Sequence, residues 1–314
     1  MSETTPVVAR ALVKRYGEIV AVDGVDLTVE AGDVFGYLGP NGAGKTTSLR
    51  MMLGLIRPSA GKVELFGRDP LVAGAKALDG VAGFVEGPRF YPYLSGRRNL
   101  RLLADYDEPL SRSRIEEALE LVELRDRAKD RVGGYSHGMR QRLGIAAALL
   151  RQPKLLLLDE PATGLDPAGM RDMRDLIRRL AAEGLTILLS SHLLYEVEEL
   201  CNRVAIVRKG SIVYEGPLGE LMATATSGHR LTTRDPERAR TIALNQRGLE
   251  NVVADGSQIR FSADEDAVAA LTVALGQARV PITQLVTETA SLEELFLGLT
   301  GGDSSDADRV VIAS

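Results

Sequence analysis

Short apolar runs alternate with amphipathic stretches along most of this chain. In the first part, the apolar runs predict short strands over residues 7–13, 19–22, 25–29, 34–38, 62–67 and 81–85. Asp23-Gly24 predicts a turn between the second and third of these strands. The pattern becomes helical between residues 95 and 150, and further strands follow over residues 155–158, 186–189 and 204–207, with helices between them. Strands that alternate with helices in this way predict a parallel α/β sheet.

The pattern changes character near residue 224, where small and polar residues predict a linker over residues 224–228. Beyond it, residues 229–300 predict strand, helix, strand, strand, helix, strand, helix, with a hairpin at Asp255-Gly256. We therefore expect a large domain over residues 5–223 and a small α+β domain over residues 229–300. The tail at residues 301–314 is predicted to be disordered.

Composition narrows the possible classes of protein. The chain has 314 residues, of which 45% are hydrophobic, so it can bury a sizeable core. A net charge of −5 argues against nucleic acid as a partner. The one cysteine, Cys201, cannot form an internal disulfide and is predicted to lie in the core. Apolar runs stay well short of the roughly 18–20 residues that cross a bilayer, and the N-terminus is not typical of a secretion signal. We expect a cytoplasmic protein.

The most specific motif is GPNGAGKT at residues 39–46, which matches the phosphate-binding pattern G-x-x-x-x-G-K-[ST]. A predicted strand precedes it and a predicted helix follows it, as a nucleotide site requires. Glycines allow successive N–H groups to turn toward phosphate oxygens, and the helix N-terminus adds positive partial charge. Lys45 is then expected to reach the β and γ phosphates, and Thr46 to offer its hydroxyl to Mg²⁺.

An acid pair, Asp159-Glu160, follows the apolar run at residues 155–158. The carboxyl end of a buried parallel strand faces the ligand crevice. Asp159 is therefore expected to face Mg²⁺, usually through a water, and Glu160 to act as general base toward the attacking water. The alternative, a strand that ends in solvent-facing acids, is disfavoured by the phosphate loop upstream.

Ser136 is a good N-cap for the helix predicted after it, and such a helix start can hold a γ-phosphate. Alone it indicates only a capped helix. SHGMRQ at residues 136–141 resembles the signature motif of the nucleotide-binding subunit of an ABC transporter. The resemblance is specific because the other motifs of that family occur in the same chain and in the family's order. PATGLDP at residues 161–167 resembles that family's segment from Walker B into the D-loop, and SSH at residues 190–192 resembles its H-loop. The resemblance of these motifs covers residues 7–222. Residues 229–300 are similar to the tail domain of many drug-export ATPases, which implies an accessory role in dimerisation or regulation, with a packing appendage as the alternative.

The resemblance implies a RecA-like parallel core with an N-terminal antiparallel β-subdomain and a helical subdomain at about residues 88–150. It also implies a homodimer whose two copies close head to tail on two ATP molecules with Mg²⁺. The catalytic residues would be Lys45, Glu160 and His192. The implied nucleotide contacts are Tyr16, Val22, Asn41, Gly42, Ala43, Gly44, Lys45, Thr46, Thr47, Glu86, Ser136, Gly138 and Asp166. The implied metal ligands are Thr46, Glu86 and Asp159.

Three of these residues also have simpler interpretations. Tyr16, which resembles the aromatic residue that stacks on adenine, could be a surface residue of the sheet. His192 could be a strand-end histidine bonded to backbone. Asp166, expected to bridge the dimer, could instead cap the next helix, and both roles are compatible.

Two residues depart from the family pattern. Glu86 stands where the family usually has Gln, and its carboxylate would bind Mg²⁺ more strongly but add charge beside triphosphate. This substitution resembles the subgroup that exports peptide antibiotics such as bacitracin and lantibiotics, and an ordinary sequence variation is the alternative. His137 stands where the signature normally has Gly, and its side chain would crowd the approach to the opposite nucleotide.

The resemblance therefore implies an ATP-hydrolysing subunit of an ABC-2-type exporter. It would lie at the cytoplasmic face of the membrane, bound to a separate membrane-spanning permease. Three alternatives remain: a soluble ABC ATPase of translation or DNA repair, a module that uses ATP only as a dimerisation switch, and a P-loop kinase. The first usually carries two cassettes or a coiled-coil insertion, and the third does not require the motifs at residues 136–141 and His192. The chain carries no information on the cargo.

Overall fold

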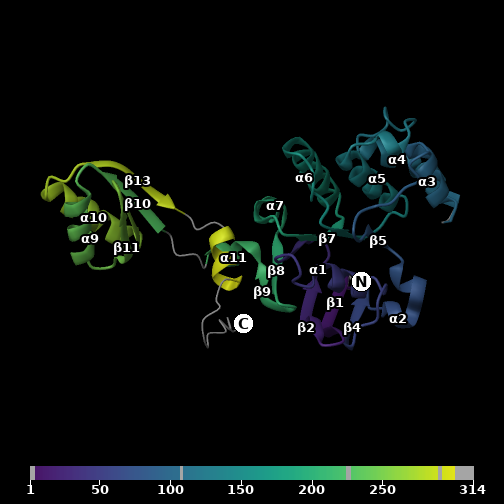
Figure 1. The fold of residues 1–314 in the computed structure, drawn as a ribbon, viewed down its shortest axis with the longest axis horizontal. Coiled ribbons are helices and arrows are strands. Elements are labelled where there is room, and N and C mark those ends of the chain that lie inside the picture. Colours follow the sequence, from purple (N-terminus) through teal and green to yellow (C-terminus); the bar gives the residue numbers. More distant parts are fainter. Residues whose placement is uncertain (1–3, 107–108, 224–227, 289–291, 301–314) are drawn as a thin grey trace. The chain divides into compact units, whose positions relative to one another are not determined.

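The computed structural model describes residues 4–106, 109–223, 228–288 and 292–300, and the chain divides into two compact units, Met1–Leu218 and Gly219–Ser314 (Figure 1). Residues 224–227 of the predicted linker and the whole predicted tail at residues 301–314 lie outside the described residues. Gly228, the last predicted linker residue, begins a strand.

The first unit begins with a three-stranded antiparallel sheet in the order β2-β1-β4. Its strands are β1 (Val7–Tyr16), β2 (Ile19–Val29) and β4 (Ala60–Leu65). The turn predicted at Asp23-Gly24 was wrong, because both residues lie inside the continuous strand β2. The pairing of β1 with β2 shifts register between Leu12–Val25 and Lys14–Val22. Gly24 has a positive φ of 67°, so the strand absorbs the irregularity without a reversal.

A six-stranded sheet forms the centre of this unit, in the order β5-β6-β7-β3-β8-β9. Its strands are β3 (Val34–Leu38), β5 (Val81–Phe84), β6 (Leu155–Asp159), β7 (Thr186–Ser191), β8 (Arg203–Arg208) and β9 (Ser211–Pro217). The first five strands in this order are parallel, which confirms the predicted parallel core. Strand β9 runs antiparallel to β8 at the edge and was not predicted.

The helices of the first unit connect and cover this sheet. They are α1 (Lys45–Met52), α2 (Pro70–Ala73), α3 (Gly96–Ala104), α4 (Ile115–Leu121), α5 (His137–Leu149), α6 (Pro167–Ala182) and α7 (Leu194–Leu200), with 3-10 turns at Gly74–Leu78, Pro109–Arg114 and Val132–Gly134. Helices α3, α4 and α5 lie together in Figure 1 and contact one another. They follow β5 and precede β6 in the chain, so they form a helical insert in the parallel core.

One hydrophobic core joins the antiparallel sheet to the parallel sheet through α1. Leu49 and Met52 of α1 are fully buried among residues of β1, β2, β3 and β6. The helix ends at Met52, and Leu53 and Ile56 pack against the same core from outside the helix. Helix α1 is therefore fixed from both sides, and so is the loop that leads into it.

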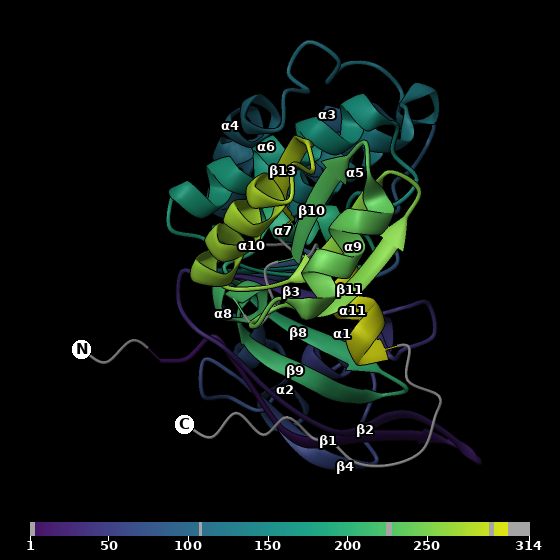
Figure 2. The same ribbon diagram turned by 90° about the vertical axis from the view of Figure 1, so that its left-hand side faces the viewer.

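The second unit contains a four-stranded antiparallel sheet in the order β11-β12-β10-β13. Its elements are α8 (Leu218–Ala223), β10 (Gly228–Thr233), α9 (Pro236–Asn245), β11 (Glu250–Asp255), β12 (Gln258–Ser262), α10 (Glu265–Gln277), β13 (Ile282–Glu288) and α11 (Leu292–Thr300). The predicted order of strands and helices is confirmed, including the hairpin at Asp255-Gly256. Helices α9 and α10 lie side by side on one face of this sheet (Figure 2), and the core there includes Ile259, Phe261 and Leu271.

Within the described ranges, no helix combines the length and apolar character that crossing a bilayer requires. Cys201 is buried, as predicted, and burial raises the pKa of its thiol.

Candidate active site

The phosphate loop joins the end of β3 to the start of α1. Gly42 and Gly44 have positive φ angles of 81° and 99°, which glycine adopts without strain. A Cβ atom at Gly44 would also collide with the carbonyl oxygen of Ala21. The first N–H groups of α1 have no partners within the helix, and they carry positive partial charge. The loop thus offers a set of donors that suits phosphate oxygens.

Lys45, the first residue of α1, points into this loop. Only 5% of its side chain is exposed. Its Nζ donates to the carbonyl oxygen of Gly39 at 2.8 Å and lies 3.2 Å from Oε1 of Glu160. The ammonium group therefore stands between the loop and the acid pair, where it can bind a phosphate.

Thr46 and Asp159 bring two oxygen ligands together. Thr46 Oγ1 donates to Asp159 Oδ2 at 2.9 Å, and Asp159 Oδ1 accepts from Ser190 Oγ at 2.6 Å. Mg²⁺ is usually held by one or two protein oxygens together with phosphate oxygens and waters. This hydroxyl and this carboxylate fit that pattern, and they lie beside Lys45.

Glu86 follows β5 and adopts a positive φ of 64°. Its backbone N–H donates a hydrogen bond to Asp159 Oδ2, with 3.3 Å between the nitrogen and the oxygen. Its side chain, however, forms an ion pair with Arg50 of α1. The structure places the Glu86 backbone beside the predicted metal site, and ligation by its carboxylate would compete with Arg50.

Glu160 has partners on both carboxylate oxygens. Oε1 faces Lys45, while Oε2 accepts from Thr163 Oγ1 at 2.7 Å and lies 2.7 Å from His192 Nδ1. Burial raises the pKa of Glu160, but the hydrogen bond from Thr163 and the charges of Lys45 and His192 outweigh it, so the net pKa is below its usual value. The carboxylate is therefore ionised at neutral pH, as a general base must be.

His192 stands at the end of β7 and is held by a carboxylate. The hydrogen-bond partner of His192 is the carboxylate of Glu160, and not a backbone group as in the alternative interpretation. A carboxylate only accepts, so Nδ1 carries the proton in this pair.

The signature motif lies at the start of α5. Ser136 caps this helix, since its Oγ accepts from the N–H of Met139 at 3.2 Å, which confirms the predicted cap. Asp166 caps α6 in the same way, with Oδ1 accepting from the N–H of Gly169 at 2.8 Å. Both helix starts line one cavity of about 350 Å³. Its lining residues are Ser136, His137, Gly138, Arg142, Gly164, Leu165, Asp166, Ala168, Gly169 and Asp172.

The predicted site residues thus form two groups. The first surrounds Lys45 and Glu160, and the second surrounds Ser136 and Asp166. Among the described residues, no hydrogen bond or ion pair joins Ser136 or Gly138 to the residues around Lys45.

The remaining predicted contacts lie on the antiparallel sheet and along the loop. Tyr16 ends β1 with 47% of its surface exposed, and the ammonium of Lys14 lies 5.1 Å from its ring centroid. Val22 is fully buried and would contact a Cβ at Gly44, so it supports the loop from behind. The others lie along the loop and the first helical turn: Asn41, Ala43 and Thr47.

Sequence reasoning gave no role to Ser190, Thr163 or Arg50. Ser190 is paired in register with Asp159 on the adjacent strand, and this register is the signal that could have found it. Thr163 lies inside the quoted motif at residues 161–167, three residues after Glu160. Arg50 is on α1, and nothing in the sequence indicates that it would meet Glu86.

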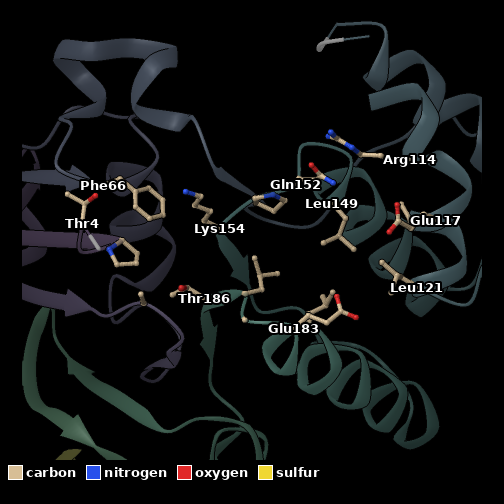
Figure 3. A pocket seen from close by; sticks show the side chains of 17 residues that line it. Thr4, Phe66, Arg114, Glu117, Leu121, Leu149, Gln152, Lys154, Glu183 and Thr186 are labelled. Carbon is tan, nitrogen blue, oxygen red and sulfur yellow. The ribbon is translucent and has the colours of Figure 1, made fainter. Parts of the chain in front are cut away.

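A second cavity, of about 620 Å³, lies elsewhere on the first unit. Figure 3 shows that side chains such as Phe66, Lys154 and Glu183 surround it. None of the predicted site residues lines it. This cavity is not part of the candidate nucleotide site.

A phosphate loop, a strand-end acid pair and a helical insert with a capped first turn, placed on one parallel core, define a P-loop ATPase. The family model described as "ABC transporter" matches residues 22–163. The chain belongs to the ATP-binding subunits of ABC transporters, because curated members of that family match nearly its whole length.

Two of these relatives come from bacilli. The uncharacterized ABC transporter ATP-binding protein YhcH of Bacillus subtilis (strain 168) is 41% identical over 281 residues, covering 89% of this chain and 91% of that protein. The bacitracin transport ATP-binding protein BcrA of Bacillus licheniformis is 38% identical over 294 residues, covering 93% of this chain and 96% of that protein. The chain is also similar to the solved dimeric structure of MJ0796, a bacterial ABC transporter cassette. That match has a TM-score of 0.61 and 26% identity, and it covers 68% of this chain and 98% of MJ0796.

Proposed function

We propose that this chain hydrolyses ATP to export an antibiotic, drug or peptide through a separate membrane-spanning permease, at the cytoplasmic face of the membrane. The observation that carries the proposal is the pairing of Glu160 with Lys45 and His192 at the end of the parallel sheet. The similarity to a bacitracin transport protein extends through the second unit, and this supports the antibiotic class of cargo.

The geometry supports a role for each of these residues. Lys45 and the loop N–H groups would bind the β and γ phosphates, and Thr46 and Asp159 would hold Mg²⁺, which would supply positive charge to the phosphates. Glu160 accepts the proton of the attacking water, and His192 orients the Glu160 carboxylate through its hydrogen bond to Oε2.

The proposal includes a homodimer that closes on ATP. Ser136 and Gly138 line a cavity that Lys45 does not line, so we assign them to the γ-phosphate held by the partner's Lys45. The likeness to a dimeric cassette supports this assignment. Asp166, at the start of α6, would lie at the same interface. The second unit would assist pairing or regulation.

A second candidate is an ATP-operated dimerisation switch without transport. The observation that favours it is His137, whose side chain lines the cavity beside Ser136 and Gly138. Phosphate release by the purified complex with its permease separates the two candidates, because the switch alone predicts ATP-dependent pairing without steady turnover.

Substitution of the base tests the proposed function. Glu160→Gln keeps the size of the side chain but cannot accept a proton, so we expect phosphate release to fall by at least about a hundredfold. Binding of ATP should remain within about threefold, because Lys45 and the loop are unchanged. Both are measured on the full chain with its permease, by phosphate release and by binding of a fluorescent ATP analogue.

Glu198→Gln is the matched control, since Glu198 is exposed on α7 and belongs to neither group of site residues. It should leave turnover unchanged. Wild-type turnover in Glu160→Gln would remove Glu160 from the role of base.

A further inference from the structure

His137 is turned toward the loop that follows the acid pair. Its Nε2 lies 3.1 Å from the carbonyl oxygen of Thr163. A carbonyl oxygen only accepts, so Nε2 carries the proton and donates. The ring also lies against Gly164, since a Cβ built there would stand 3.7 Å from His137 Cδ2. The histidine thus connects the first turn of α5 to the loop between β6 and α6.

Thr163 connects this loop to the base. Its Oγ1 donates to Glu160 Oε2 at 2.7 Å, and its N–H donates to the carbonyl oxygen of Glu160 at 3.2 Å. The carbonyl oxygen of the same residue receives the hydrogen bond from His137. Thr163 is therefore fixed on one side by α5 and on the other by Glu160.

Glu160 Oε2 also accepts from His192, so the position of this oxygen depends on two donors, while Lys45 faces Oε1. Without the hydrogen bond from His137, only the bonds to Glu160 itself would hold Thr163, and its hydroxyl would be less firmly placed. His192 would then be the more firmly placed donor to Oε2. A carboxylate with one fewer fixed donor spends less time in the geometry that a water-activating base needs.

We propose that His137 is a positioning residue for ATP hydrolysis, which acts through Thr163 on Glu160 of its own chain. This inference rests on the proposed function, because its consequence concerns a pair of copies. Ser136 and Gly138 flank His137 and are assigned to the nucleotide of the partner. His137 thus links the signature that meets one ATP to the base that acts on the other ATP.

Two substitutions of similar size separate the hydrogen bond from the bulk of the side chain. The Nε2 of Gln occupies nearly the place of His Nε2, so His137→Gln keeps a donor, whereas His137→Met keeps the volume and removes the donor. We expect kcat of His137→Met to fall about fivefold, the factor that corresponds to one hydrogen bond, with KM for ATP unchanged. His137→Gln should stay within about twofold of wild type. Equal losses in both variants, or no loss in His137→Met, would overturn the proposal.

Mixed dimers show in which chain His137 acts. Two copies with different tags are co-expressed with the permease and purified through both tags, and the reference pair combines wild type with Glu160→Gln. In the first arrangement, His137→Met is placed in the copy that keeps Glu160. In the second, His137→Met and Glu160→Gln are placed in the same copy, so the active Glu160 keeps its own His137.

Action within one chain predicts that the first arrangement is about fivefold slower than the reference and that the second equals the reference. Direct contact of His137 with the partner's nucleotide predicts the reverse, and that result would overturn the proposal. Equal slowing of both arrangements would indicate a general structural defect and would also overturn it, as would two rates equal to the reference.

The reference pair keeps this test separate from the proposed function. If wild type shows neither turnover nor ATP-dependent pairing, the proposed function fails and this inference fails with it. If the reference pair turns over ATP and the first arrangement is as fast, only the role of His137 is refuted.

Discussion

Glu86 and Glu160 both lie near Asp159, but different groups surround their carboxylates. Glu160 is held by Thr163 and His192 and is fixed against the phosphate loop. Glu86 presents only its backbone N–H to Asp159, and its more exposed side chain pairs with Arg50. Because an exposed ion pair is weak, the Glu86 carboxylate can exchange Arg50 for a cation at little cost.

This difference makes the metal-ligand prediction for Glu86 testable. If Glu86 binds Mg²⁺, Glu86→Gln should raise the Mg²⁺ concentration that gives half-maximal ATPase activity, because an amide is the weaker ligand. Arg50→Gln is the matched control. It frees the carboxylate and should lower that concentration or leave it unchanged. An unchanged Mg²⁺ dependence in Glu86→Gln counts against ligation.

At the scale of elements, strand β2 supports the phosphate loop. Ala21 and Val22 lie directly behind Gly44, and Leu49 of α1 packs into the same core. The N-terminus of α1 is therefore fixed by the antiparallel sheet as well as by the parallel one. Residue 44 must therefore be glycine for two reasons, its positive φ and the lack of space for a Cβ atom against β2.

Gly44→Ala should lower ATP binding by more than about tenfold, because the added Cβ would push the loop away from β2. Gly32→Ala is the control for strain alone, since Gly32 has a positive φ of 82° but open space around it. It should cost about 1–2 kcal/mol of unfolding free energy and leave ATP binding unchanged. Both quantities come from nucleotide titration and urea unfolding. Normal ATP binding by Gly44→Ala would contradict the role of β2.

The elements that the sequence predicted best are those whose pattern is local. Strand β6 is buried on both faces, so it reads as a continuous apolar run at residues 155–158. Strand β9 was missed because it is a partly exposed edge strand that is defined by its pairing with β8. The site residues show the same difference between local and long-range signals. Lys45 and Glu160 were found within local motifs, whereas the pairing of Glu86 with Arg50 depends on how β5 and α1 pack.

At the scale of the whole molecule, the described residues of each unit include a hydrophobic core of their own. One surrounds α1 in the first unit, and the other surrounds Leu271 of α10 in the second unit. All residues of both site groups lie in the first unit. A core that is complete within one unit predicts that this unit can fold and bind nucleotide by itself.

A chain that ends at residue 223 should therefore fold cooperatively and bind ATP with Mg²⁺ within about threefold of the full chain. Circular dichroism on heating and titration with a fluorescent ATP analogue measure the two properties. Glu160→Gln in the same short chain should bind ATP equally well, which serves as the control for an intact site. Aggregation of the short chain, or a loss of binding above about tenfold, would show that the first unit depends on the second.

The most direct test of the account is a cryo-EM structure of the Glu160→Gln variant with its permease, ATP and Mg²⁺. Ser136 Oγ and the N–H of Gly138 should lie within hydrogen-bonding distance of the γ-phosphate that is bound by the partner's Lys45. A closed pair in which Ser136 is remote from every γ-phosphate would contradict the claim that the two copies complete each other's sites.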